Sequence, residues 1–239
     1  MIKPGFISKK AEIKKSKIAL NAIIYGNSYI GTNSILDSFS IIGYPIRSKT
    51  KEIMIRKNNQ KALEDDYDSI SSGSSLGNKN HIRPYTTIYE RTVLENNVET
   101  GTNVIIREDC FIGEGSMIGS GSVLDGGVRI GKKARIQSMN FIPPKIEIGD
   151  NVFLGPSVRF ANDTYPVSNK LTGIKVKDNV IIGIGSIILP GITIETGSII
   201  AAGSLVTKNV PENTVIMGSP AKFFMKREVY DKKKKEYEK

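Results

Sequence analysis

A large aliphatic residue recurs at every sixth position through the middle of the chain. Fourteen of the fifteen positions in this series are large and apolar, and the remaining one is a threonine. The series consists of Leu76, Ile82, Ile88, Leu94, Thr100, Ile106, Ile112, Ile118, Leu124, Ile130, Ile136, Ile142, Ile148, Leu154 and Phe160. A period this short, held over this length, is typical of a repeat architecture, and a six-residue period predicts a parallel β-helix.

A second series of small or β-branched residues lies four positions after the aliphatic one. It comprises Thr86, Thr92, Val98, Val104, Cys110, Ser116, Ser122, Val128, Ala134, Val152 and Val158. Side chains two apart on a strand share a face, so the small residue and the next large one should both point inward. Three short strands joined by tight bends would close one triangular coil, and successive coils would stack about 4.8 Å apart. Stacking buries a continuous apolar ladder that no single coil could bury alone.

The same register continues upstream from Ile18 to Ile42 and downstream from Val176 to Val206. It breaks twice, which predicts loop excursions from the coils over roughly residues 43–75 and 161–175. The serine-rich end of the first excursion is expected to be flexible. A β-sandwich or open sheet would instead show alternation with turns every 8–12 residues. We therefore expect an all-β chain.

The end of the chain has a different character. Residues 1–218 are expected to form the β-helix domain, and residues 219–239 a C-terminal helix or tail. Ser219 followed by Pro220 fits an N-cap and the first helical position. Phe223, Phe224 and Val229 are then available to pack against the coils.

Composition limits the partners. The 239 residues carry a formal charge of +10, but they contain no zinc-ligand spacing, arginine-rich recognition helix or aromatic RNA-binding motif. A small polyphosphate molecule is therefore the expected partner, rather than nucleic acid. No apolar run reaches the length of a membrane span, and the first residues lack the apolar core of a signal peptide. The single Cys110 falls on an inward position, which indicates a buried structural thiol and fits a reducing cytoplasm.

Several segments resemble the hexapeptide-repeat acyltransferase superfamily. They are the hexads that begin with Ile-Gly or Leu-Gly, and the ending from Ala201 to Lys208 and from Gly218 to Lys222. Three others are similar to motifs of N-acetyltransferases that act on nucleotide-linked amino sugars, namely residues 100–108, 141–143 and 160–166. The resemblance extends over roughly residues 18–227.

The resemblance implies left-handed coils, a homotrimer with active sites at subunit boundaries, and acetyl-CoA as the co-substrate. It implies that the later coils hold coenzyme A, with the lysines facing its phosphates. The residues placed near coenzyme A in this way are Ile184, Gly185, Ala202, Lys208 and Lys222.

The expected reaction is transfer of an acetyl group to the amine of a nucleotide-linked amino sugar. Candidates for handling the proton are His81, Asn103 and Asp163, and candidates for holding the substrate are Arg107, Glu108 and Asn162. The chain departs from the amino-sugar enzymes at Thr102, where a histidine often stands. An amine that binds in its neutral form needs no base before attack, so this loss does not exclude the reaction.

Three other functions compete with this one. An O-acetyltransferase on a sugar or other hydroxyl acceptor, or a succinyltransferase, would use the same fold, but a hydroxyl needs a base more strongly. A non-catalytic β-helix scaffold would bind no acetyl-CoA. A zinc hydratase typically needs three histidine ligands, and the chain has a single histidine, so no metal site is expected.

Overall fold

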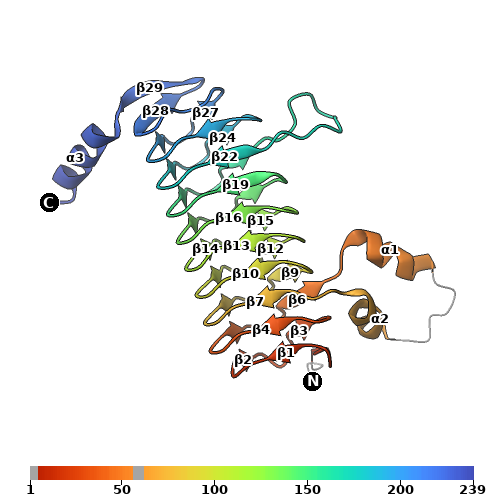
Figure 1. The fold of residues 1–239 in the computed structure, drawn as a ribbon. Helices are drawn as coiled ribbons and strands as arrows, with labels where there is room; N and C mark the ends of the chain where they lie inside the picture. Colours follow the sequence, from red (N-terminus) through yellow and green to blue (C-terminus); the bar gives the residue numbers. More distant parts are fainter. Residues whose placement is uncertain (1–4, 56–61) are drawn as a thin grey trace.

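The protein is described by a computed structural model, which covers residues 5–55 and 62–239. The chain winds as a left-handed parallel β-helix whose coils stack into a three-sided prism (Figure 1). Each coil contributes one short strand to each of three parallel sheets. The six-residue period therefore records the length of one side, as the sequence predicted.

The first sheet holds nine strands: β1 (Glu12–Ile13), β4 (Tyr29–Ile30), β7 (Ser75–Leu76), β10 (Val93–Leu94), β13 (Phe111–Ile112), β16 (Arg129–Ile130), β19 (Ile146–Ile148), β22 (Ile174–Val176) and β25 (Thr193–Ile194). The second holds eleven: β2 (Lys17–Ile18), β5 (Ile35–Leu36), β8 (His81–Ile82), β11 (Glu99–Thr100), β14 (Met117–Ile118), β17 (Arg135–Ile136), β20 (Phe153–Leu154), β23 (Ile181–Ile182), β26 (Ile199–Ile200), β28 (Thr214–Gly218) and β29 (Ala221–Lys226). The third holds nine: β3 (Ile23–Ile24), β6 (Ile41–Tyr44), β9 (Thr87–Tyr89), β12 (Ile105–Ile106), β15 (Val123–Leu124), β18 (Phe141–Ile142), β21 (Arg159–Phe160), β24 (Ile187–Ile188) and β27 (Leu205–Val206).

Both inward series predicted from the sequence are buried. Every large apolar member from Leu76 to Phe160 is at most 5% exposed, and so is every member of the small series. Thr100, the one exception in the aliphatic ladder, is also buried. Its hydroxyl accepts a hydrogen bond from the Arg83 amide at 3.0 Å and lies 3.3 Å from the Thr86 hydroxyl. A buried hydroxyl costs little when it is hydrogen-bonded, which explains why the ladder tolerates threonine.

Two asparagines also occupy the small inward position. The Asn80 side chain donates to the Gly77 carbonyl and accepts from the Val98 amide. Asn140 donates to the carbonyls of Gln137 and Gly155 and accepts from the Val158 amide. Each amide therefore ties neighbouring coils together inside the core.

The prism has three edges, where the chain turns from one sheet to the next. We call them the first/second, second/third and third/first edges, after the sheets that they join. Each turn needs one residue in the left-handed backbone region. Glycine fills that place at Gly121, Gly185 and Gly203 of the second/third edge, each with φ of +67°. Other turns use bulkier residues, including Phe39 and Tyr85 on the same edge, each with φ of +61°.

The first excursion leaves the third/first edge after β6 and returns at β7. It contains two helices, α1 (Arg47–Ile55) and α2 (Leu63–Ile70). The expected flexibility of its serine-rich end was wrong. Ser71 and Ser74 are buried, and their hydroxyls donate to the carbonyls of Gly43 and Tyr89, both at 2.6 Å.

The second excursion spans residues 161–173, between β21 and β22. It leaves from the same third/first edge as the first excursion, because both follow strands of the third sheet. Figure 1 shows the two excursions projecting from the same side of the prism, separated by several coils.

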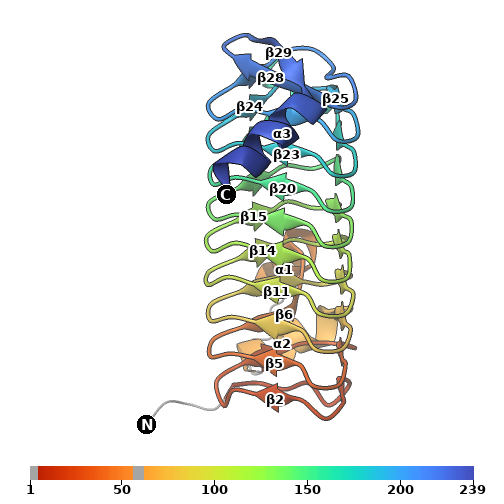
Figure 2. The ribbon, with the colours of Figure 1, turned by 90° about the vertical axis from the view of Figure 1, so that its left-hand side faces the viewer.

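The C-terminal prediction was partly wrong. Ser219 and Pro220 do not start a helix, because they form the turn of an antiparallel hairpin in which β28 pairs with β29. The helix α3 (Arg227–Tyr237) begins only after that hairpin. It projects away from the prism beside the second sheet (Figure 2), and it contains no buried residue. Phe223, Phe224 and Val229 stay 66%, 50% and 41% exposed, so they do not pack on the coils as expected.

Among residues 5–55 and 62–239, none of the three helices is long and apolar enough to cross a bilayer.

Candidate functional site

The residues singled out from the sequence fall on two different edges of the prism. Asn103, Ile184, Gly185 and Ala202 lie in turns of the second/third edge. Arg107, Glu108, Asn162, Asp163 and Lys208 follow strands of the third sheet and therefore lie on the third/first edge. His81 stands on strand β8 of the second sheet, and Lys222 lies in the hairpin strand β29. Most candidates of one chain therefore line two edges, and several coils separate some members of the same edge.

Three of the candidate coenzyme A residues, Ile184, Gly185 and Ala202, lie with Gly203 on the second/third edge, in a segment that we call the bare strip. The Gly203 amide donates to the Ile184 carbonyl at 2.8 Å, so these two turns lie one above the other. At Gly185 and Gly203 an added Cβ would meet no atom within 4 Å, which means that the space outside the backbone is open. Ile184 beside them is 55% exposed. The absence of side chains at Gly185 and Gly203 lets an extended ligand approach the backbone closely there.

The third/first edge carries a charged cluster between the two excursions. The Arg107 guanidinium donates to the Glu108 carboxylate from Nε at 3.1 Å and from Nη2 at 2.9 Å. Its Nη1 lies 3.1 Å from Asp125, and its Cζ lies 5.6 Å from the centre of the Tyr89 ring. Arg107 is therefore held by two carboxylates and a ring, which leaves few donors for an anionic substrate.

Gly126 and Gly127 follow Asp125 directly on this edge. A Cβ at Gly126 would come within 3.3 Å of Glu108 Oε1, whereas one at Gly127 would meet nothing within 4 Å. The carboxylates of Glu108 and Asp125 consequently keep an open side, with 19% and 25% of their side chains exposed.

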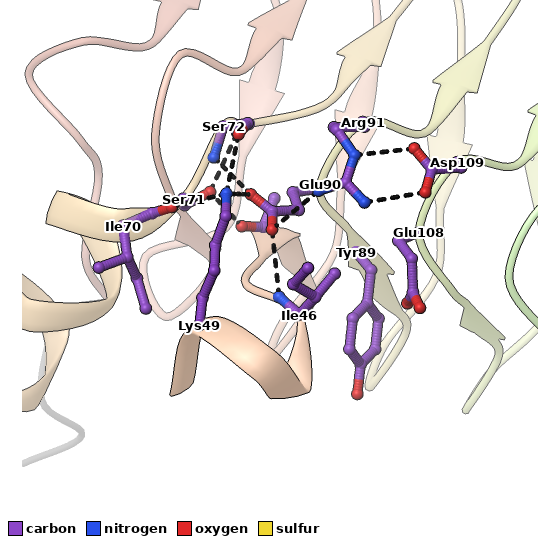
Figure 3. A network of polar contacts seen from close by, with 12 residues as sticks. Ile46, Lys49, Ile70, Ser71, Ser72, Tyr89, Glu90, Arg91, Glu108 and Asp109 are labelled. Carbon is purple, nitrogen blue, oxygen red and sulfur yellow. Dashed lines mark hydrogen bonds and ion pairs between the residues drawn. The ribbon is translucent and has the colours of Figure 1, made fainter. Parts of the chain in front are cut away.

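Glu90 anchors the first excursion to this edge, as Figure 3 shows. Its side chain is fully buried, and its carboxylate accepts from Lys49 Nζ and from the Ser72 amide, both at 2.6 Å. It also accepts from the Ile46 amide at 3.2 Å and lies 3.1 Å from Arg91 Nη1. Burial alone would raise the pKa of Glu90, but the hydrogen bonds from Lys49, Ser72 and Ile46 outweigh it and hold the pKa below its ordinary value.

Four tyrosines fill the contact between the excursion and the coils. Tyr44 lies 5.5 Å from Tyr67 of α2 and 5.1 Å from Tyr89, and Tyr25 packs edge-on against both Tyr44 and Tyr67. Tyr89 joins this group to Arg107. The position of α1 and α2 is thus tied to the charged cluster through both Glu90 and the tyrosines.

Asn162 and Asp163 lie at the base of the second excursion. The Asn162 side-chain amide donates to the Pro144 carbonyl at 3.3 Å, and the backbone carbonyl of Asn162 accepts from the Thr172 amide at 2.7 Å. The Asp163 carboxylate accepts from the amides of Ser168 and Tyr165, at 2.9 and 3.0 Å. The Ser168 bond lowers the pKa of Asp163, and both residues contribute to the shape of the loop.

His81 is paired with a carboxylate. Its Nε2 lies 2.9 Å from Asp37 Oδ2, and about a third of the imidazole is exposed. A carboxylate on one ring nitrogen fixes the orientation of the ring and leaves Nδ1 free to exchange a proton. Asn103 differs: it occupies the left-handed turn position, with φ of +58°, and it is exposed. Its side chain makes no hydrogen bond within the described part of the chain.

Three residues named from the sequence remain: Lys208, Lys222 and Cys110. Lys208 and Lys222 are exposed near the C-terminal end of the prism. Cys110 is buried, as expected, and burial raises the pKa of its thiol to about 12. Over residues 5–55 and 62–239, the structure groups no three His, Cys, Asp or Glu side chains so that they could hold a metal ion.

Sequence reasoning missed Glu90 and Asp125. Both occupy the same kind of turn as residues that were singled out, because strand β12 pairs with β9 on one side and with β15 on the other. The sequence signal was the length of one coil. One coil after Arg107 lies Asp125, and one coil before Arg107 and Glu108 lie Tyr89 and Glu90.

Comparison with known proteins identifies the repeat. Residues 173–208 match the family model "Bacterial transferase hexapeptide (six repeats)", and residues 103–138 match "Hexapeptide repeat of succinyl-transferase". Three curated relatives illustrate the similarity. A putative acetyltransferase of Schizosaccharomyces pombe is 48% identical over 85 residues, covering 32% of this chain and 41% of that protein. The galactoside O-acetyltransferase of Lactococcus lactis is 39% identical over 101 residues, covering 39% and 48%.

The match to the third relative covers a larger share of that protein. Protein CapG of Staphylococcus aureus is 38% identical over 121 residues, which are 45% of this chain and 70% of that protein. The chain spans less than half the length of the other two relatives. The six-residue ladder, the stripped turns at Gly185 and Gly203 and the similarity to CapG agree, and the chain belongs to the hexapeptide-repeat family of transferases.

Proposed function

We propose that the protein is an acetyltransferase that moves an acetyl group from acetyl-CoA to the amine of a nucleotide-linked amino sugar. The observation that supports acetyl-CoA as the donor is the bare strip of the second/third edge, where Ile184, Gly185 and Ala202 lie together beside Gly203. An extended thioester arm needs close approach to the backbone, and this strip gives it. The acetyltransferase names of the S. pombe and L. lactis relatives support the same donor.

The amine acceptor is supported by the charged cluster. Arg107 is already held by Glu108 and Asp125, so the groups of this cluster that remain open to a substrate are carboxylate oxygens. Carboxylates accept hydrogen bonds from an amine and from sugar hydroxyls. Asn162 extends the same edge toward the second excursion. These residues are proposed to position the sugar.

The chemistry is an aminolysis. The neutral amine attacks the thioester carbonyl, and a C–N bond forms as a tetrahedral oxyanion develops. The oxyanion then collapses, the C–S bond breaks, and the proton lost from nitrogen ends on the departing thiolate. The protein must mainly position the two reactants, since positioning alone can supply a large part of the rate. His81, whose Nε2 lies 2.9 Å from Asp37 Oδ2, is proposed to relay the proton. Asp163 is not assigned this role, because loop amides occupy its carboxylate.

We further propose a homotrimer. The donor strip and the acceptor cluster lie on different edges of one prism, so two neighbouring chains could supply the two halves of each site. The third sheet joins these edges, and its outward positions are largely apolar: Ile23, Ile41, Ile105, Val123, Phe141, Ile187 and Leu205. Such a face can pack against a second copy. Sedimentation equilibrium that returned the mass of a single chain would contradict this assembly.

An O-acetyltransferase is the second candidate, because the His81–Asp37 pair could deprotonate a hydroxyl. The test is a panel of acceptors incubated with acetyl-CoA and assayed by thiol release. The panel contains nucleotide-linked 3-amino and 4-amino sugars and the matching 3-hydroxy and 4-hydroxy sugars. Turnover of an amino sugar with little turnover of its hydroxyl counterpart supports the proposal. Turnover of hydroxyl acceptors alone would replace it with the second candidate.

A further inference from the structure

Two aromatic side chains form an exposed stack on the second/third edge. The rings of Phe39 and Tyr85 are nearly parallel, with 8° between their planes and 5.1 Å between their centres. They are 42% and 56% exposed. The amide of Tyr85 donates to the carbonyl of Ser38, so the two residues stand on neighbouring coils at the same place in the turn. The ring spacing matches the coil spacing of about 4.8 Å.

The coil itself does not require aromatic residues here. This turn position has φ near +60°, which favours glycine and asparagine over bulky residues. Elsewhere on the same edge the position is filled by Gly121, Gly185 and Gly203, and by Asn103, Met139 and Ser157. Large exposed rings at an unfavourable backbone position gain little from the core. Within the described residues, Phe39 and Tyr85 are the only aromatic residues among the positive-φ turn residues of this edge, which directs attention to a function outside the core.

The next place in the column holds only a small amide. Asn103 follows Tyr85 by one coil, since the backbone N–H of Asn103 donates to the Pro84 carbonyl at 3.0 Å. Above it, Gly121 has no side chain, and its open side is covered by Met139, whose Sδ lies 2.6 Å from where a Cβ would be. A planar ring laid on the outer face of Tyr85 would therefore lie beside the Asn103 amide. The side-chain amide of Asn103 offers one acceptor and two donors, and it has no partner within the described residues.

We propose that Phe39 and Tyr85 form a stacking platform for the nucleobase of the acceptor, and that the Asn103 amide hydrogen-bonds to the edge of that base. This inference rests on the proposed function, because it takes the acceptor to be nucleotide-linked. Aromatic platforms bind bases of any sequence through their π faces, whereas an amide can distinguish their edges. The role of Asn103 is then binding, not proton transfer.

Adenine from coenzyme A is the other possible source of a planar base. The geometry favours the acceptor. The bare strip at Gly185 lies five strands along the second sheet from Tyr85, from β8 to β23. At about 4.8 Å a coil this separation is roughly 24 Å. The lysines proposed to meet the coenzyme A phosphates lie still further along, near the C-terminal end.

The experiment measures binding by calorimetry for UDP, dTDP and GDP, and separately for adenosine 3′,5′-bisphosphate. Tyr85→Ala is expected to lose about tenfold in affinity for the best nucleoside diphosphate, and Tyr85→Phe to retain wild-type affinity. Phe39→Ala should weaken binding in the same direction. Met139→Ala is the matched control, because Met139 occupies the same turn position on the same edge and is 58% exposed. It should bind as the wild type does.

Three results would overturn the proposal. No nucleoside diphosphate binds the wild type, or Tyr85→Ala binds the nucleoside diphosphates as well as the wild type does, or Tyr85→Ala loses affinity only for the adenosine bisphosphate. Proton NMR of the bound base provides a second readout. Stacking on Tyr85 shifts the base protons upfield, and the chain has no tryptophan to confuse the effect. Acetyl transfer to a free amino sugar is assayed in parallel. If that transfer persists in Tyr85→Ala while nucleotide binding is unchanged, the platform fails and the proposed acetyl transfer stands.

Discussion

The Lys49 ammonium lies 2.6 Å from the Glu90 carboxylate, and the side chain of Glu90 has no exposed surface. Lys49 belongs to α1 in the first excursion, whereas Glu90 belongs to the coils. This contact therefore joins the excursion to the prism near Glu108 (Figure 3). Glu108 belongs to the charged cluster with Arg107 and Asp125.

Glu90→Gln should lower the free energy of unfolding by about 2 kcal/mol, because a charged hydrogen bond is lost inside a buried site. Urea denaturation measures this change. The control is Asp109→Asn, which removes an exposed partner of Arg91 and should cost less than about 1 kcal/mol. Equal losses in the two variants would contradict the special position of Glu90.

The same carboxylate predicts how stability depends on pH. The folded pKa of Glu90 lies below its ordinary value of 4.5, so the folded state holds the carboxylate ionised more strongly than the unfolded state does. The stabilisation is complete above the unfolded pKa and is lost as the pH falls through the folded pKa. Stability should therefore decline below about pH 4.5 in the wild type, and Glu90→Gln should decline less steeply.

Leu124→Ala should cost about 2–5 kcal/mol, because Leu124 is fully buried in the ladder and its truncation leaves a cavity. Leu20→Ala is the matched control: Leu20 is 76% exposed, and its truncation should change stability by less than about 0.5 kcal/mol. Thermal or urea unfolding of both variants checks this. A small loss at Leu124 would mean that the coils do not close around it.

The six-residue ladder explains why the prism could be predicted from the sequence. Inward positions repeat without exception from Leu76 to Phe160, and even Thr100 keeps the register by bonding its hydroxyl to Arg83 and Thr86. Gly185 was singled out differently, through the resemblance to the hexapeptide-repeat acyltransferases, and its role in binding the donor stays a prediction.

The excursions and the chain end carry no such register. Glu90 and Glu108 occupy the same turn position, but only Glu90 is buried, because α1 and the Ser72 segment cover it. No local pattern distinguishes the two. Ser219–Pro220 has the composition of a helix start, yet the pairing of Met217 with Lys222 closes a hairpin there. Long-range pairing decided both cases.

Gly185→Leu should raise the Michaelis constant for acetyl-CoA roughly tenfold or more, which corresponds to about 1.4 kcal/mol of lost binding, because a side chain would fill the open strip. Gly115→Leu is the control for backbone strain. Gly115 has φ of +72° against +67° for Gly185, but it lies on the first/second edge. Both variants should lose similar stability, roughly 1–2 kcal/mol. A wild-type Michaelis constant for acetyl-CoA in Gly185→Leu would show that acetyl-CoA does not bind along this strip.

His81→Ala should slow transfer to an amine by no more than about tenfold, because a neutral amine attacks without prior deprotonation. Asp37→Asn should act in the same direction and more weakly, since it only releases the imidazole from its partner. Steady-state rates at saturating acceptor measure both. A loss of about 10² to 10⁴ in His81→Ala, with acetyl-CoA affinity unchanged, would instead indicate an ester-forming enzyme that depends on its base.

The identity of the bond made is the most direct measurement. The wild-type protein is incubated with acetyl-CoA and a nucleotide-linked amino sugar, and the product is examined by mass spectrometry before and after treatment with hydroxylamine. We predict a product one acetyl group heavier than the acceptor and stable to hydroxylamine, as an amide is. A product that loses its acetyl group to hydroxylamine, or no acetylated sugar at all beside turnover of a plain sugar hydroxyl, would contradict transfer to an amine.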